Sequence, residues 1–184
     1  MRDFSRRKGV YTARLEEFEV ALLESLVQQV VDQISGDLAP ESSDPFEQLV
    51  GCMGAGPSLD HEDPVIARLF PDAYPDDPSA SSDFRRYTES DAVRSRLADA
   101  QIVLEDLGAT HDGKEPVRIA PDRVTPWIKT LNALRLALSA RLGITDDAAY
   151  NNLSRLPARD PRSQMVNLYN WIGYVLESLL SALR

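Results

Sequence analysis

The chain has 184 residues, 43% of them apolar, and a formal net charge of −9 at neutral pH. A chain of this length buries about 70% of its unfolded surface, so it needs neither a disulfide nor a metal to stay folded. No window approaches the roughly 18 apolar residues of a transmembrane helix, and no apolar run follows the basic N-terminus as in a signal peptide. Cys52 is the single cysteine, which excludes an intramolecular disulfide and fits a reducing compartment. We expect a cytoplasmic protein with one domain over residues 1–184, in which residues 1–9 form a flexible arm.

The negative charge lies in one block. Residues 37–91 hold 13 acids and 3 bases, a balance of −10, so the rest of the chain sums to +1. Such a surface repels the phosphate backbone, because nucleic-acid affinity comes mainly from lysine and arginine. It favours a basic partner, and the alternative is a loop-rich stretch kept in solution by its charge.

A strand pattern opens the ordered part of the chain. Residues 10–15 alternate, with Tyr11, Ala13 and Leu15 on one side. A lone strand leaves its backbone groups unpaired, and residues 116–119 form the other short strand-like run. We predict a small two-stranded antiparallel β-ribbon from these two segments.

The first long helix is predicted over residues 16–34, with Gly36 as its stop. Its apolar stripe is wide enough to be buried against more than one neighbour. The stripe contains Phe18, Leu22, Leu26 and Val30 and is widened by Leu23, Val27, Val31 and Ile34.

Two short helices are predicted next, over residues 46–52 and 65–70. Each follows an aspartate and a proline, Asp44-Pro45 and Asp63-Pro64. The aspartate accepts the free N–H groups of the first turn, and the proline has none to satisfy. The glycine-rich residues 51–57 between them predict a flexible hinge.

Three more long helices complete the predicted fold. The first covers residues 80–107, is capped by Ser79, Ser81 or Ser82, and turns Phe84, Tyr87, Val93, Leu97, Ala100, Leu104 and Leu107 to the core. The second covers residues 122–142 and buries Trp127, Leu131, Leu134, Leu138 and Leu142. The third covers residues 164–183 and buries Leu168, Trp171 or Ile172, Val175 and Leu179. The chain is therefore predicted to be mainly α, a bundle of about four long helices with two short ones and the small ribbon.

Four segments resemble an actinobacterial family known only as domain of unknown function number 2017. They are residues 19–26 (EVALLESL), 63–74 with 83–89 (DPVIARLFPDAY, DFRRYTE), 127–138 (WIKTLNALRLAL), and 168–172 with 177–179 (LYNWI, ESL). The resemblance implies a small cytoplasmic helical protein. It also implies genes for a Clp protease adaptor and a metal-dependent isopeptidase-like enzyme nearby. It supplies no catalytic residues.

Signatures of catalysis and of cofactor binding are absent from the sequence. There is no zincin motif, no paired C-x-x-C, no P-loop, no dinucleotide fingerprint and no nucleophile elbow. His61 lies among acids, but adjacent residues seldom converge on one ion, and Asp63 is explained as a cap. We expect no catalytic residue, no metal site and no cofactor.

The arginines offer candidate binding residues. Arg68, Arg85 and Arg86 are the bases of the acidic block, and they either bind its aspartates or form, with Tyr74, a pocket for an anionic group. Arg135 lies in the apolar repeat of residues 122–142, one turn after Asn132, and is expected in a buried hydrogen-bond pair.

The most favoured function is a non-enzymatic interaction or regulatory protein, with a link to Clp-type protein turnover that rests on the resemblance. A protein partner or self-association is expected, a membrane is not, and nucleic acid is disfavoured. One alternative is a transcriptional regulator, for which the bases of residues 122–142 are too widely spaced. The other is a small-ligand-binding protein or cryptic enzyme, which requires a pocket lined by Arg68, Tyr74, Arg85 or Arg135. The ligand itself is unknown.

Overall fold

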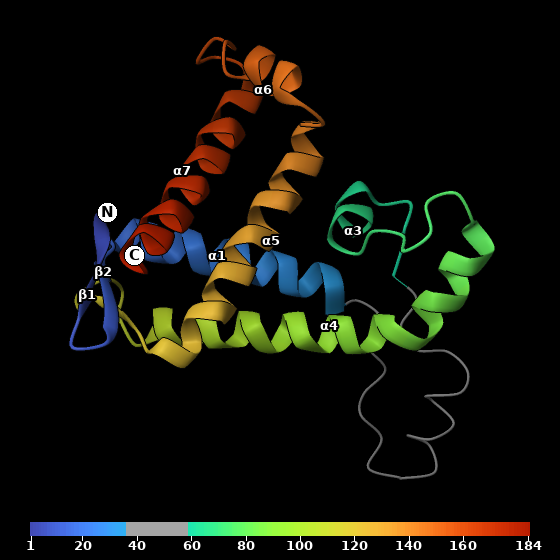
Figure 1. The fold of residues 1–184 in the computed structure, drawn as a ribbon. Coiled ribbons are helices and arrows are strands. Elements are labelled where there is room, and N and C mark those ends of the chain that lie inside the picture. Colours follow the sequence, from blue (N-terminus) through green and yellow to red (C-terminus); the bar gives the residue numbers. More distant parts are fainter. Residues whose placement is uncertain (36–58) are drawn as a thin grey trace, which may run out of the picture.

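The computed structural model describes residues 1–35 and 59–184. The fold is mainly α, as predicted (Figure 1). In chain order its elements are β1 (Arg2–Arg7), β2 (Val10–Arg14), α1 (Glu17–Ser35), α3 (Pro64–Leu69), α4 (Pro78–Gly108), β3 (Val117–Ile119), a 3₁₀ turn (Pro121–Arg123), α5 (Val124–Leu142), α6 (Asp147–Leu153) and α7 (Pro161–Ala182). The predicted short helix 46–52, the hinge 51–57, Gly36 and Cys52 lie outside the described residues.

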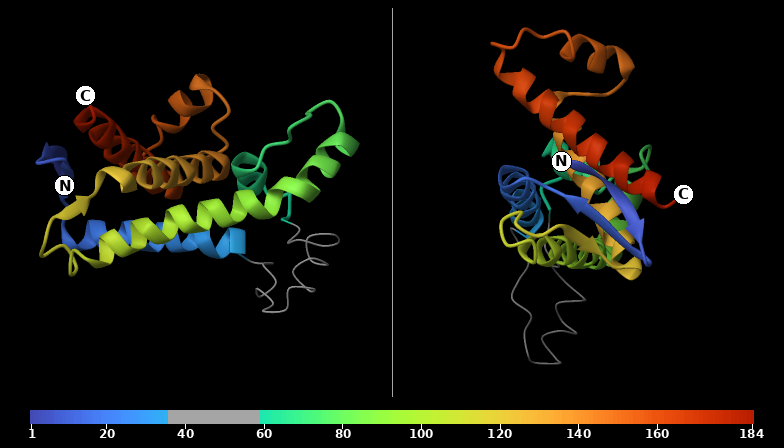
Figure 2. Two further views of the ribbon diagram at one scale, coloured as in Figure 1. Left: turned by 60° about the horizontal axis from the view of Figure 1, so that its bottom comes forward. Right: turned by 90° about the vertical axis from the view of Figure 1, so that its left-hand side faces the viewer.

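Helix α5 is the centre of the bundle. It packs against α1, α3, α4 and α7. Helices α1 and α4 lie alongside one another, α5 crosses them, and α7 returns beside α5 towards the sheet (Figures 1 and 2).

No helix among the described residues is both long and apolar enough to cross a bilayer.

The sheet has three antiparallel strands in the order β1-β2-β3. The predicted pairing is confirmed, since Tyr11 of β2 faces Ile119 of β3. The prediction of a flexible arm over residues 1–9 was wrong, because they form β1 and its turn. Lys8 and Gly9, with φ of 51° and 83°, make the two-residue turn of a β-hairpin.

Contacts with α7 and α5 hold β1 in place. The Phe4 side chain is 6% exposed and lies edge-on to Trp127, with ring centroids 6.3 Å apart. The backbone N–H of Phe4 donates to Ser178 Oγ at 2.8 Å. The Tyr174 hydroxyl donates to Asp3, and this hydrogen bond raises the pKa of Tyr174. These contacts with α5 and α7 order β1, although five of its six residues are polar.

The face that α1 buries differs from the predicted stripe. Phe18 is 68% exposed and Leu22 36% exposed. The buried apolar residues of α1 are Val20, Leu23, Val27 and Ile34. The apolar residues of α1 span a wider arc than its neighbours cover, so part of the predicted stripe faces solvent.

Aspartate–proline pairs mark the helix starts. Asp63 caps α3 as predicted, accepting from the N–H groups of Val65 and Ile66. The cap of α4 is Asp77, followed by Pro78, and not one of the predicted serines. Asp160 and Pro161 start α7 in the same way, three residues before the predicted start. Aspartate and serine cap helices about equally well, but proline favours the first helical position, so the acid directly before each proline is the stronger signal.

Helix α6 was not predicted. It has seven residues and buries none of them, so it shows no apolar periodicity. Gly143, with φ of 67°, ends α5 in the left-handed conformation, as predicted.

A buried carboxylate joins α4 to α5. The side chain of Trp127 is fully buried, and its indole N–H donates to Asp106 Oδ2 at 2.8 Å. Arg123 donates to the other oxygen of Asp106 at 2.8 Å and lies 3.2 Å from Glu105. The hydrogen bond that Arg123 donates to Asp106 raises the pKa of Arg123. Asp106 therefore orients the first turn of α5 against the last turns of α4.

Asp106→Ala is expected to lower the free energy of unfolding by about 2–3 kcal/mol, because the Trp127 N–H stays buried without an acceptor. The control is Glu105→Ala, which removes a 49% exposed partner of the same Arg123 and should cost less than about 0.5 kcal/mol. Urea unfolding followed by tryptophan fluorescence and circular dichroism measures both. Equal losses of unfolding free energy in the two variants would show that Asp106 does not join α4 to α5.

Candidate interaction site

The first turns of α4 project beyond the rest of the bundle (Figure 2). They rise at an angle to the remainder of the helix (Figure 1). The Thr88 hydroxyl donates to the carbonyl of Phe84 at 2.9 Å, and this back-bonding bends helices. The first turns thereby leave the surface that α1 and α5 cover.

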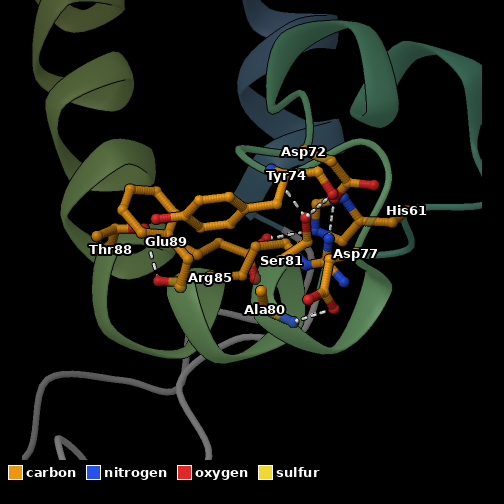
Figure 3. Close-up of polar contacts among 10 residues, drawn as sticks. His61, Asp72, Tyr74, Asp77, Ala80, Ser81, Arg85, Thr88 and Glu89 are labelled. Carbon is orange, nitrogen blue, oxygen red and sulfur yellow. Dashed lines mark hydrogen bonds and ion pairs between the residues drawn. The ribbon is translucent and has the colours of Figure 1, made fainter.

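Polar contacts attach the preceding loop to this part of α4 (Figure 3). Ser81 is fully buried, and its hydroxyl donates to the Tyr74 carbonyl at 2.8 Å and accepts from the Tyr74 N–H at 3.1 Å. Asp77 caps the helix by accepting from the N–H of Ala80 at 2.9 Å. The loop before α4 is thus bound by its backbone, which also sets the direction of Tyr74.

One pair of the predicted arginine–aspartate network is present between described residues. Arg85 of α4 binds Asp72 in the loop, an ion pair that Figure 3 shows. The guanidinium of Arg86 lies 6.0 Å from the ring centroid of Tyr87. Arg68 is on α3, exposed, and faces a different pocket. Arg68 therefore lies in a pocket with Arg135, apart from the surface where Tyr74, Arg85 and Arg86 lie.

Aromatic side chains are exposed at this end of α4, where two of them were predicted to face the core. Tyr74 is 50% exposed, Phe84 45% and Tyr87 73%. The rings of Tyr74 and Phe84 pack edge-to-face with centroids 6.2 Å apart. Among the residues that the structure describes, no other element covers these turns, so the aromatic rings are at the surface. We call this surface the aromatic end; it consists of Tyr74, Phe84, Arg85, Arg86 and Tyr87.

His61 anchors the aromatic end to the segment before α3. Its Nε2 lies 2.6 Å from Glu89 Oε1, and Figure 3 shows the pair across the loop. Both side chains are largely buried, at 23% and 12% exposure. His61 therefore has a structural contact. Among the described residues, no three histidine, cysteine or acidic side chains are grouped as metal ligands.

A second candidate site is a pocket of about 470 Å³ between α3, α5, α6 and α7, which Arg68 and Arg135 line. The prediction that Arg135 pairs with Asn132 was not met, because Asn132 is exposed. Arg135 instead donates to the Tyr169 hydroxyl at 3.1 Å, with its guanidinium 5.0 Å from that ring centroid. Tyr169 is one helix away on α7, which sequence spacing does not reveal.

The exposed face of the sheet is basic, a feature that sequence analysis missed. A depression of about 800 Å³ is lined by five basic residues and one acid, Asp3. The bases are Arg2, Arg7, Lys8, Arg14 and Arg118. Arg2 and Arg7 are the bases of this depression on β1, and because the strand has an irregularity between Arg2 and Ser5, simple alternation does not place them on one face.

Ser81→Ala is expected to free the loop before α4, because it removes both hydrogen bonds to Tyr74 and leaves buried backbone groups unpaired. Hydrogen exchange of residues 71–77 should accelerate by at least about tenfold, which corresponds to roughly 1.4 kcal/mol. Ser82→Ala is the control, since Ser82 is exposed beside it. Unchanged exchange in Ser81→Ala would show that other contacts hold the loop.

Two sequence relatives are named as oxidative stress regulators. The putative oxidative stress regulator AosR of Mycobacterium leprae is 32% identical over 180 residues, which cover 90% of this chain and 78% of the relative. The oxidative stress regulator AosR of Mycobacterium tuberculosis is 26% identical over 186 residues, which cover 94% of this chain and 82% of the relative. No solved structure matches.

The family model described as a domain of unknown function, DUF2017, matches residues 1–183, nearly the whole chain. This is the family that the four sequence segments predicted. The chain belongs to the DUF2017 family.

Proposed function

We propose that this protein is a non-enzymatic regulator in an oxidative stress response, and that it acts by binding another protein through the aromatic end of α4. The relatives named oxidative stress regulators support the regulatory role. The exposure of Tyr74, Phe84 and Tyr87 on a projecting helix is the observation that carries the binding role. The absence of catalytic motifs from the sequence supports a non-enzymatic protein.

The composition of the aromatic end is that of an interface centre. Tyrosine and arginine are enriched among the residues that dominate binding energy, and each large ring removed from water contributes about 1.5–3 kcal/mol. Here Ser81 holds the backbone of Tyr74, the Tyr74 ring packs on Phe84, and Asp72 holds the Arg85 side chain. Side chains held in this way lose less conformational entropy when a partner binds.

Charge indicates the chemistry of the partner. The loop before α4 and the first turns of the helix carry Asp72, Asp76, Asp77, Asp83 and Asp91, all exposed. An acidic rim around an aromatic centre favours a partner with an apolar pocket and a basic border, since complementary charge accelerates association. A Clp protease adaptor, whose gene the resemblance implies to be nearby, is one candidate to test, and a second copy of this chain is another.

The route of an oxidant signal is limited by cysteine content. Cys52 is the single cysteine, so an intramolecular disulfide cannot form in this chain. An intramolecular disulfide is therefore not the route of an oxidant signal in this chain, and binding to a partner supplies a different one.

Tyr87→Ala is expected to weaken partner binding at least about tenfold without lowering the melting temperature, because the ring is 73% exposed. The matched control is Phe18→Ala on α1, which removes a ring that is 68% exposed elsewhere on the surface. The tagged full chain and both variants are used to purify partners from native extract with and without peroxide, and binding of the recovered protein is then measured by calorimetry.

One protein recovered by wild type and Phe18→Ala, and lost with Tyr87→Ala, would support the proposal. Recovery that is the same with all three proteins would place the interface elsewhere. A strain that carries Tyr87→Ala should also lose the transcript changes that oxidant produces in the wild type. If it kept them, the aromatic end would have no regulatory role.

A second candidate function, regulation by contact with nucleic acid, is favoured by the basic sheet face. Antiparallel strands that present arginines can enter a DNA groove. Affinity for DNA falls as salt rises, and each phosphate that the protein neutralises steepens the plot of log affinity against log salt by about 0.9. The net charge of −9 opposes this candidate.

Combined Arg7→Ala and Arg118→Ala should reduce the salt slope of binding to mixed-sequence duplex DNA by about 2 if the sheet face contacts DNA. Combined Arg155→Ala and Arg159→Ala, at exposed arginines after α6, is the control. Fluorescence anisotropy between low and physiological salt measures the slope. Absence of wild-type binding at low salt would exclude this candidate and leave the aromatic end as the proposed site.

A further inference from the structure

A pocket of about 390 Å³ lies between α1, α4 and α5, apart from the aromatic end and from the basic sheet face. Its volume is within the range of small-molecule sites, about 300–1,000 Å³. Most of its wall is apolar and comes from all three helices: Val27, Val30 and Ile34 of α1, Ala92 and Ala100 of α4, and Ala133 and Leu134 of α5.

One polar side chain in this wall has no partner among the described residues. Thr130 of α5 is 7% exposed, and its buried hydroxyl makes no hydrogen bond. Burying a hydroxyl without a partner costs about 1–3 kcal/mol. Helical threonine populates two χ1 rotamers, so a rotation can present this hydroxyl to a molecule in the pocket.

The charged residues that line the pocket leave one positive charge in excess. Lys129 Nζ lies 3.2 Å from Asp99 Oδ2, and this pair neutralises itself. Arg96 donates to the Leu69 carbonyl at 2.6 Å and lies 4.9 Å from the Phe70 ring centroid, and the Asp99 carboxylate also interacts with its charge. Lys129, Asp99 and Arg96 are the charged residues of the lining. Two cations and one carboxylate complement a single negative charge.

We propose that this pocket binds a small amphipathic monocarboxylate. The hydrocarbon part lies against the valine, isoleucine, alanine and leucine side chains, where burial of apolar surface stabilises it. The carboxylate lies towards Lys129 and Arg96, and the Thr130 hydroxyl donates to it. The proposal does not depend on the protein-binding role of the aromatic end.

The test measures octanoate and benzoate binding to the full chain by titration calorimetry, with 1-octanol as the uncharged comparison. We expect one site, at which at least one of the two acids binds at least about tenfold more tightly than the alcohol. Ala92→Phe places a ring at the pocket wall and should abolish binding, whereas Ala98→Phe, at an exposed alanine of the same helix outside the lining, should not.

Thr130→Val keeps the side-chain shape and should weaken acid binding about fivefold to tenfold, the effect of one hydrogen bond to a charged group. This variant should fold at least as stably as wild type, because it removes an unpartnered buried hydroxyl. It therefore tests the site even if Ala92→Phe fails to fold. No heat with either acid, an alcohol that binds as tightly, or an unchanged affinity in Thr130→Val would overturn the proposal.

Discussion

The carboxylate of Asp106 is the contact on which the arrangement of helices depends. Its oxygens accept from the Trp127 indole and the Arg123 guanidinium at 2.8 Å each, so the end of α4 is bound to the start of α5. A buried carboxylate without donors would cost several kcal/mol, which leaves few alternatives to this pairing. The Trp127 ring also packs against the Phe4 ring in a T-shaped arrangement, and this contact joins β1 to α5. The central position of α5, with α1, α3, α4 and α7 around it, follows from that orientation.

Helix α4 serves two purposes along its 31 residues. Its last turns are buried in the core through Val103 and Leu107, whereas its first turns are held by polar contacts such as those of Ser81 and Arg85. Polar contacts can orient a surface without covering it, so the aromatic rings at this end stay accessible. The surface charge also differs between the two ends of the molecule, with acids around the aromatic end and bases on the sheet face. The two surfaces therefore suit partners of opposite charge.

The repeat of apolar residues located every long helix, because a helix in a bundle must bury a continuous stripe. The same repeat misplaced Phe18, Leu22, Phe84 and Tyr87, which were expected in the core and are exposed. Periodicity indicates that a face is apolar, but it does not indicate whether another element packs on that face. For the candidate site, the sequence singled out Tyr74, Arg85 and Arg86 as neighbours in the chain. It grouped Arg68 with them, although Arg68 lies with Arg135 in another pocket.

The sequence by itself determined the helical class, the family and the features that act within a few residues. Asp63 before Pro64 starts α3, Gly143 ends α5, and Tyr11 with Ala13 marks the buried side of β2, because capping, turn and strand chemistry are local. Only the tertiary structure decided the partner of Arg135, the unpartnered hydroxyl of Thr130 and the exposure of Tyr87. Each of these depends on where one helix lies relative to another, and that placement is set by the packing of residues distant in the chain.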